Sequence, residues 1–271
     1  MKIQTILNWH SHKLILTLIC LSFFSFTTQK AQASHAMGTD LTYECLGGNV
    51  YEFTLSFYRD CDGVNAPTSA IIDIGSISCG FSTTLQLAQV GTAIDISPLC
   101  SSALSSCVGG PNPGAEQYIY TGTFTLPQNC NDWVFSFSHC CRNNDITNLV
   151  SPASENIYIE STLDNTGGLC NSSPTFTTLP VPYLCANQLV NYNFGTYDSD
   201  GDSLVYTLVN ALGYTGGADT LIYVAGYSPT YPITTDSGYV DFDNLTGSLT
   251  FTPDTEQVCV VTCLVEEYRN G

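Results

Sequence analysis

LTYECLGGNVYEFTLSFY, residues 41–58, is the stretch that decides the fold. Every second residue is apolar from Leu41 to Cys45 and again from Tyr51 to Phe57, and the residues between them are mainly polar. An alternation of this kind is typical of strands that have one face in a core. Leu46-Gly47-Gly48-Asn49 supplies a turn between the two runs. The stretch therefore predicts an antiparallel β-hairpin.

The same period of two recurs further along the chain. Trp133, Phe135 and Phe137 share one face of a later run, and an earlier run places four large side chains on one face: Tyr118, Tyr120, Phe124 and Leu126. No stretch has a convincing helical period, and Gly, Pro, Asn and Ser turns separate the runs. We predict an all-β chain in which residues 34–168 form an antiparallel sandwich.

Residues 169–271 are predicted to form a second β-domain. Pro174, Pro180 and Pro182 make an extended connection into it, and strand patterns resume from Gln188. The expected fold is thus two tandem antiparallel β-sandwich domains, Ig-like or cadherin-like, with disulfides. Asn270-Gly271 is the strongest two-residue hairpin signal. We therefore expect the second domain to be incomplete and the natural protein to continue past Gly271.

The first 33 residues read as a secretory signal peptide. An apolar run spans Leu14 to Phe26, and Ala31-Gln32-Ala33 is a small-x-small cleavage site. The run is too short to cross a bilayer as a helix, and no later stretch is long enough. We expect cleavage near Ala33, no transmembrane segment, and a mature chain that lies outside the cytoplasm.

The mature chain is strongly acidic. Without residues 1–33 it keeps three arginines and no lysine against 24 acids, a formal charge of −21. Such a surface repels nucleic acid and anionic membranes and tolerates divalent cations. Aromatic residues make up 11% and hydrophobic residues 44%, which places the chain among folded proteins.

Twelve of the 13 cysteines lie outside the signal peptide, and an even number in an exported chain predicts a disulfide framework. Cys170 and Cys185 flank a proline-containing loop, and we expect them to pair. Neighbouring strand residues point to opposite faces, so Cys140 and Cys141 should have different partners. Cys259 and Cys263 lie about 13 Å apart along a strand, too far to bridge each other. A long loop over residues 100–114 should be tied down by Cys100 or Cys107.

Tyr197-Asp198-Ser199-Asp200-Gly201-Asp202-Ser203-Leu204 concentrates three carboxylates on alternate residues, just before a strand pattern. Three such charges are stabilised together when a hard cation such as Ca²⁺ binds them, because it takes six to eight oxygen ligands. Candidate ligands are Asp198, Asp200 and Asp202, and four acids could complete the site if the fold brings them near: Asp241, Asp243, Glu266 and Glu267. The EF-hand pattern is excluded by Ser203 and Val209 at its sixth and twelfth positions. The alternative is a polar turn whose acids are only solvated.

Two sequence patterns resemble catalytic or metal-binding motifs, and we predict a structural role for the residues of both. Gly201-Asp202-Ser203-Leu204 matches the opening of a serine esterase family, but His35 and His139 both precede Ser203, and the required base normally follows it. Residues 138–145 place a histidine beside two cysteines, a spacing that does not suit zinc. We expect Arg142 to pair with backbone and acids at a sheet edge, and we predict that the chain is not an enzyme.

Several motifs together resemble a known family: Ser34-His35-Ala36-Met37-Gly38, Tyr58-Arg59-Asp60-Cys61, Cys140-Cys141-Arg142-Asn143, the loop from Asp198 to Leu204, and Val265-Glu266-Glu267-Tyr268-Arg269-Asn270-Gly271. They are similar to the N-terminal region of large Bacteroidetes cell-surface proteins that are exported by the type IX system and associated with gliding motility. The acidic loop, with Gly247 to Pro253, is also similar to cadherin-like repeats. The resemblance implies strings of Ig-like or cadherin-like domains, and a chain that is secreted or displayed at the cell surface in association with the outer membrane.

These observations lead to a non-catalytic structural or adhesion protein, associated with gliding or surface attachment and stabilised by calcium. Its partners would be an extracellular surface, a glycan or a protein ligand. The alternative is a carbohydrate-binding module of a secreted polysaccharide-degrading protein, with a flat aromatic platform supplied by one segment: Tyr214, Tyr223, Tyr227 and Tyr231. The alternative interpretation of these tyrosines is that they pack at the edge of the domain.

Overall fold

The predicted hairpin is present and forms the edge of a large sheet. In this computed structural model, which describes residues 36–100, 102–180, 183–214 and 217–269, β1 (Ala36–Gly47) pairs with β2 (Val50–Asp60). Leu41 lies opposite Leu55 and Tyr43 opposite Phe53, so the apolar residues of both strands share a face. Asn49 takes a left-handed conformation, with φ 61°, at the turn. The alternation in the sequence therefore set the register.

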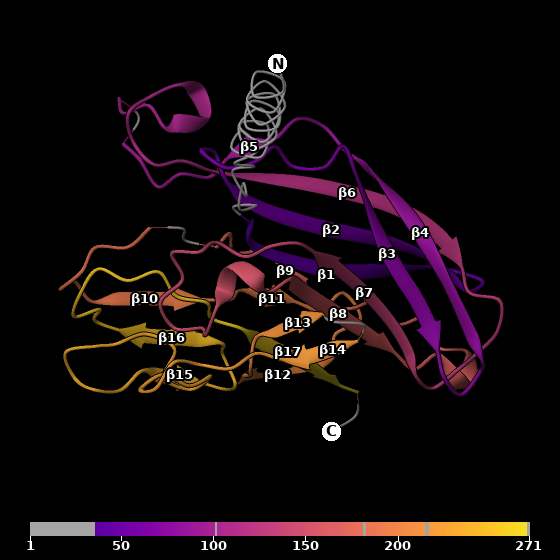
Figure 1. Cartoon of the computed structure of the whole chain (residues 1–271). Helices are drawn as coiled ribbons and strands as arrows, with labels where there is room; N and C mark the ends of the chain where they lie inside the picture. Colours follow the sequence, from indigo (N-terminus) through magenta and orange to yellow (C-terminus); the bar gives the residue numbers. More distant parts are fainter. Residues whose placement is uncertain (1–35, 101, 181–182, 215–216, 270–271) are drawn as a thin grey trace, which may run out of the picture. The chain divides into compact units, whose positions relative to one another are not determined.

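Eight strands form the main sheet, in the order β1-β2-β6-β4-β3-β7-β8, with β5 paired to β6 (Figure 1). The remaining strands of this sheet are β3 (Ser69–Ser76), β4 (Phe81–Gln89), β5 (Ile94–Asp95), β6 (Ala115–Thr125), β7 (Trp133–His139) and β8 (Ile157–Leu163). All of its strand pairs are antiparallel. Short turns join β1 to β2 and β3 to β4, whereas pairs such as β2 with β6 and β3 with β7 join strands that are far apart in the chain.

The two edges of the main sheet meet, so the sheet is nearly closed and barrel-like. Ser161 on β8 donates its hydroxyl hydrogen to the carbonyl of Leu41 on β1. Tyr43 on β1 donates to the carbonyl of Thr162 at 2.8 Å. Side chains of alternate residues fill the interior, among them Phe53, Trp133 and Phe135, each with no exposed surface. Phe53 and Phe135 contact edge to face, with ring centroids 4.7 Å apart.

The second half of the chain, residues 169–269, forms small antiparallel sheets. They order as β10-β16-β15, β9-β11, β12-β17 and β13-β14. The strands are β9 (Thr175–Phe176), β10 (Val190–Asn193), β11 (Thr196–Tyr197), β12 (Ser203–Leu208), β13 (Leu212–Tyr214), β14 (Ala218–Thr220), β15 (Asp241–Asp243), β16 (Ser248–Phe251) and β17 (Cys263–Tyr268). A separate apolar cluster of Leu208, Ile233, Leu249 and Phe251 supports the three-stranded sheet.

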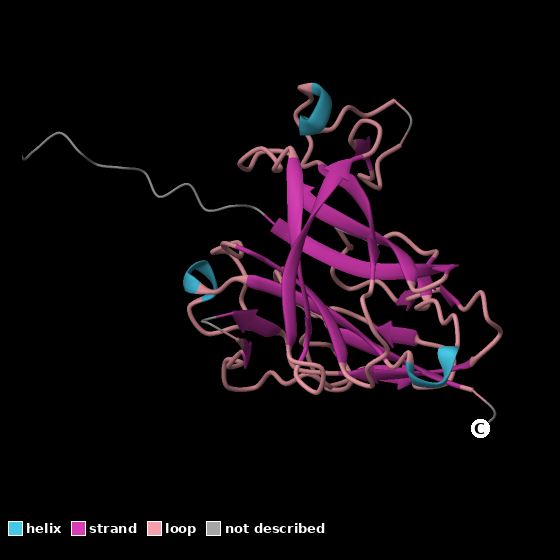
Figure 2. Cartoon of the chain, turned by 90° about the vertical axis from the view of Figure 1, so that its right-hand side faces the viewer, coloured by secondary structure: helices cyan, strands magenta, loops and turns pink. Residues whose placement is uncertain are grey.

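The all-β class with disulfides is confirmed. Figure 2 shows strands and loops, and the helical elements among the described residues are three 3₁₀ turns: Ser106–Val108, Pro152–Ser154 and Thr166–Gly168. Two tandem sandwiches are not confirmed, because the described residues belong to one compact unit and the first half is a nearly closed sheet. The signal peptide and the final Asn-Gly pair lie outside the described residues. Over the described ranges, no helix has the length and apolar character needed to span a membrane.

A short segment after β7 joins the second half to the main sheet. Asn148 has no exposed surface, and its side-chain amide donates to the carbonyls of Pro232, at 3.0 Å, and Val260, at 2.8 Å. Its Oδ1 accepts from the backbone N–H of Val260 at 3.0 Å. Close by, Ile146 and Leu149 pack with Ala211 and Leu221 in a small apolar cluster. Residues 146–149 thus connect the two halves through both polar and apolar contacts.

Arg142 lies in the same connection and is buried. Its guanidinium donates to the carbonyls of Asn156, at 3.2 Å, and Leu212, at 2.9 Å. Burial lowers the pKa of Arg142 to about 10. The expected pairing of this side chain with backbone is confirmed, and the hydrogen bonds of its guanidinium to described residues go to carbonyls and not to the expected acids.

The disulfides correct two expectations. Cys170 pairs with Cys45 on β1, not with Cys185, whose thiol is free and exposed. Cys140 and Cys141 pair with each other, not with separate partners. The first expectation failed because nearness along the chain does not show which strand lies beside Cys170. The second failed because β7 ends at His139, so the alternation of side chains along a strand does not apply to Cys140 and Cys141.

The other cysteines divide into bridged and free. Cys61 bridges Cys107 and so ties down the long loop, as expected for one of its two cysteines, and Cys79 bridges Cys130. The free thiols in the described part of the chain are those of Cys100, Cys185, Cys259 and Cys263. The expectation that Cys259 and Cys263 do not bridge each other is confirmed.

Candidate functional site

The acidic loop connects β11 to β12 and curls around one of its own carboxylates. Asp198 Oδ1 accepts the backbone N–H groups of Asp200 and Asp202, both at 2.9 Å. Gly201 takes φ +82°, a conformation that other residues rarely adopt, and lets the loop reverse there. Asp198 is consequently only 7% exposed. The alternating acids of the sequence therefore converge, with one carboxylate oxygen from each of Asp198, Asp200 and Asp202 within 4.8 Å of the others.

The antiparallel partner strand brings a fourth acid to the site. In the pairing of β12 with β17, Glu267 lies opposite Leu204. Its carboxyl group contacts that of Asp198, and burial, helped by the charges of Asp198 and Asp202, raises the pKa of Glu267 to about 7. Two buried oxygens here, Asp198 Oδ2 and Glu267 Oε2, have no hydrogen-bond partner within the described part of the chain. Two buried carboxylate oxygens without donors are costly unless a proton or a cation lies between them.

Polar groups from two other segments enclose the acids. Asn171 donates its side-chain amide to Glu267 Oε1. The backbone N–H of Ser172 donates to Asp200 Oδ2 at 2.7 Å. Arg269 forms a two-pronged pair with Asp202, with Nε to Oδ1 at 2.9 Å and Nη2 to Oδ2 at 2.6 Å. The site thus draws on the acidic loop, on β17 and the residue after it, and on the segment that follows the Cys45–Cys170 bridge.

The donor set suits a hard divalent cation. Two oxygens bound to one Ca²⁺ at 2.3–2.6 Å lie at most about 5 Å apart, which the 4.8 Å spread of the three aspartates satisfies. Asp198, Asp200, Asp202 and Glu267 face one guanidinium, an excess of three negative charges when all four acids are ionised. All the candidate ligand atoms are oxygens, the ligands that Ca²⁺ prefers.

Three of the acids considered from the sequence lie elsewhere. Asp241 and Asp243 are on β15, and Asp243 Oδ1 accepts the backbone N–H of Leu245, at 2.8 Å, to form its own turn. Glu266 neighbours Glu267 on β17 and so points to the opposite face of the strand, where it is exposed. The structure brings Glu267 to Asp198, Asp200 and Asp202 and does not bring the other three.

Sequence reasoning missed Asn171, Ser172 and Arg269 at this site. Asn171 and Ser172 carry no pattern that marks them. Arg269 did offer a signal, because it is one of only three arginines in the sequence and follows Glu267 by two residues. A lone cation in so acidic a chain is expected to meet acids.

The two groups considered for catalysis, Ser203 and His139, lie at the ends of strands and make pairing and packing contacts there. Ser203 begins β12 and pairs with Tyr268 on β17. His139 ends β7, where its ring stacks on Phe137 and meets Phe57 edge to face at 5.3 Å. Burial lowers the pKa of His139.

Three of the four tyrosines considered as a sugar platform, Tyr214, Tyr223 and Tyr231, make separate internal contacts. Tyr214 stacks on Tyr158, with ring centroids 5.7 Å apart. The hydroxyl of Tyr223 accepts the backbone N–H of Ala211, and that of Tyr231 accepts the N–H of Thr235. These contacts are those of residues that hold loops in place.

No family model, curated protein or solved structure matches this chain.

Proposed function

We propose that this chain is a non-catalytic structural or adhesion module of a secreted or cell-surface protein, stabilised by a divalent cation, with Ca²⁺ the best fit. The observation that carries the proposal is the buried pair of unpartnered oxygens, Asp198 Oδ2 and Glu267 Oε2. A cation between them satisfies both and links the acidic loop to β17. Asn171 and Ser172 extend that link to the Cys45–Cys170 bridge and so to the main sheet.

A role in adhesion is supported by the rigidity that such a link gives the module. A folded β-module must hold its shape outside the cell, where calcium is plentiful and extracellular modules bind it at about 10⁻⁴–10⁻³ M. Three disulfides between distant residues, Cys45–Cys170, Cys61–Cys107 and Cys79–Cys130, stiffen the same structure. Rigid presentation of a surface is consistent with attachment or gliding, as the sequence resemblance implies.

The test is a thermal melt of residues 34–271 in EDTA and in millimolar Ca²⁺, for the natural chain and for Asp198→Asn. Asparagine keeps Oδ1 as the acceptor of both loop N–H groups and turns Oδ2 into a donor that faces Glu267. We expect the variant to be more stable than the natural chain in EDTA, by about 1–3 kcal/mol or roughly 2–10 °C. It should also lose the rise in melting temperature that Ca²⁺ gives the natural chain.

Asp243→Asn is the matched control, because Asp243 is an exposed acid that forms only its own turn. It should keep the full calcium response. The proposal fails if calcium leaves the melting temperature of the natural chain unchanged, or if Asp198→Asn responds as the natural chain does.

A further inference from the structure

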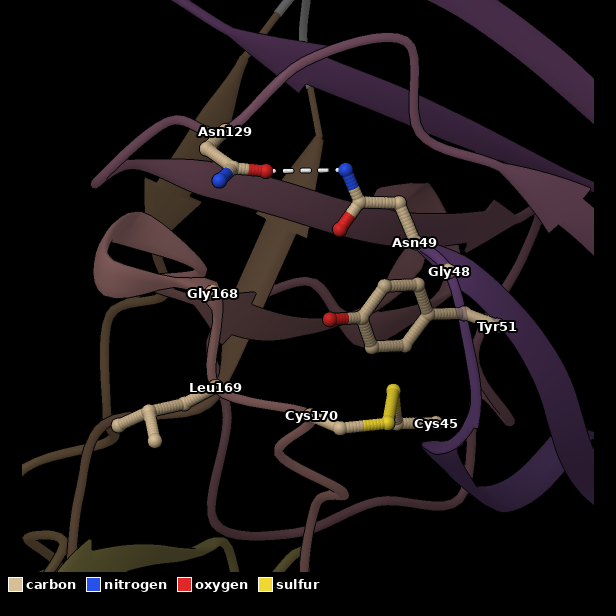
Figure 3. Close-up of a pocket in the computed structure, with 8 residues that line it drawn as sticks. All are labelled: Cys45, Gly48, Asn49, Tyr51, Asn129, Gly168, Leu169 and Cys170. Atoms are coloured by element: carbon tan, nitrogen blue, oxygen red, sulfur yellow. Dashed lines mark hydrogen bonds between the residues drawn. A yellow bond between two sulfur atoms is a disulfide. The ribbon is translucent and has the colours of Figure 1, made fainter.

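A separate cavity lies beside the β1–β2 turn. It has a volume of about 350 Å³ and is bounded by the turn, by the β6–β7 loop and by the segment after β8 (Figure 3). This volume is within the range of small-molecule sites, about 300–1,000 Å³. The residues that line it carry no charged side chain. The cavity is therefore large enough for a small ligand and neutral in character.

The hydroxyl of Tyr51 is the most informative group in the cavity. Tyr51 has no exposed surface, and its hydroxyl oxygen has no hydrogen-bond partner among the described residues. Figure 3 shows the hydroxyl pointing into the space between Asn129, Gly168 and the Cys45–Cys170 bridge. Burial raises the pKa of Tyr51, so the group remains protonated and can both donate and accept a hydrogen bond.

Two side-chain amides stand beside that hydroxyl. Asn49 Nδ2 donates to Asn129 Oδ1 at 2.9 Å, which fixes both groups in orientation. The pairing leaves Asn49 Oδ1 as an acceptor, which points toward Tyr51, and Asn129 Nδ2 as a donor, which lies on the side of Gly168 (Figure 3). The cavity thus offers an oriented acceptor, an oriented donor and a hydroxyl that serves as either.

A disulfide holds one wall of the cavity in place, and the space beside two glycines of the lining is open. The Cys45–Cys170 bridge joins β1 to the segment after β8 and forms an apolar side of the cavity. Gly48 and Gly168 take φ +60° and +73°, and a Cβ added at either would meet no atom within 4 Å. The space beside both glycines is therefore open, and their backbone conformation disfavours any larger residue there.

We infer that this cavity binds a neutral sugar residue. Vicinal hydroxyls match the alternating donor and acceptor atoms of Asn49, Tyr51 and Asn129, and the disulfide offers an apolar surface to the C–H face of a sugar ring. Uronic and sialic acids are disfavoured, because no cationic side chain lines the cavity and the chain as a whole is acidic. This site shares no lining residue with the cation site, although Asn171 of that site directly follows Cys170, and it does not include the tyrosine segment. Its ligand does not depend on the proposed function.

The test uses residues 34–271 and a panel of neutral methyl glycosides and disaccharides, with glucuronic acid as the charged comparison. Binding is followed by saturation-transfer NMR and then by titration calorimetry for any sugar that responds. At least one neutral sugar should bind, and glucuronic acid should not. Tyr51→Phe and Asn129→Ala should each weaken binding about tenfold, the effect of one lost hydrogen bond.

Tyr120→Phe is the matched control, because Tyr120 is equally buried but donates its hydroxyl hydrogen to the carbonyl of Pro67 at 2.6 Å, away from the cavity. It should bind sugar as the natural chain does. The inference is overturned if no neutral sugar binds, or if Tyr51→Phe retains full affinity while folded. Calorimetry in EDTA and in Ca²⁺ separates this result from the cation site: sugar binding without a calcium response would leave the inference standing and remove the proposed function.

Discussion

Replacing Asn148 with alanine tests the connection between the main sheet and the second half of the chain. The asparagine side chain makes three hydrogen bonds, all to backbone groups of Pro232 and Val260, and it has no exposed surface. Alanine removes all three and leaves two carbonyls and one N–H buried without partners. At about 1 kcal/mol for each lost bond, and more where a buried group stays unpaired, the cost is about 3–4 kcal/mol.

That loss is large beside the usual 5–15 kcal/mol of folding free energy. For a chain of this size it corresponds to a drop in melting temperature of roughly 6–16 °C. The assay is urea unfolding followed by tryptophan fluorescence, together with a thermal melt followed by circular dichroism. Trp133 is buried in the main sheet and reports on that half.

Asn193→Ala is the comparison, because Asn193 is exposed while its side chain also makes three hydrogen bonds, to Thr246, Ser248 and the backbone N–H of Gly195. It should cost under about 1 kcal/mol, since water replaces those bonds. Equal stabilities for the two variants would refute the reasoning, because they would show that the second half does not rely on Asn148.

Further predictions concern charge and thiols. Burial raises the pKa of Asp40 from 3.8 to about 6, so the folded chain binds this proton more tightly than the unfolded chain, and the stability that this gives is lost as pH rises from about 4 to about 6. Asp40→Asn should therefore gain stability over the natural chain as pH rises from about 4 to 6, in thermal melts at each pH, and a constant difference across that range would contradict this. Native protein should react rapidly with a thiol reagent at exposed Cys100 and Cys185 and slowly at Cys259 and Cys263, whose thiol pKa values burial raises to about 11 and about 12. Four thiols should react after denaturation, and a count of none would show that these cysteines pair.

Local patterns predicted local structure well. The alternation from Leu41 to Phe57 gave both the hairpin and its buried face, because a period of two leaves one choice of register when one side is in a core. Trp133, Phe135 and Phe137 were assigned to a single buried face for the same reason. The acidic loop was recognised because three carboxylates in five residues have no reason to be together in water alone.

Contacts between residues that are far apart in the chain could not be predicted from the sequence. Closure of the main sheet depends on β1 meeting β8, which are more than 100 residues apart, and no local pattern encodes that contact. The same limit explains Cys170, whose partner Cys45 is 125 residues away, and Glu267, which reaches Asp198 only through the pairing of β12 with β17. Asn148 gave no signal because a buried asparagine is recognised only from the backbone groups around it.

The most direct test of the cation site is a calcium titration of EDTA-treated residues 34–271 by calorimetry, repeated for Glu267→Gln. The natural chain should bind one Ca²⁺ with a dissociation constant of about 10⁻⁴–10⁻³ M. Glu267→Gln should keep its contact with Asn171 through the amide oxygen and bind at least tenfold more weakly. Calcium binding of unchanged strength in the variant, or none in the natural chain, would contradict a cation held between Asp198 and Glu267.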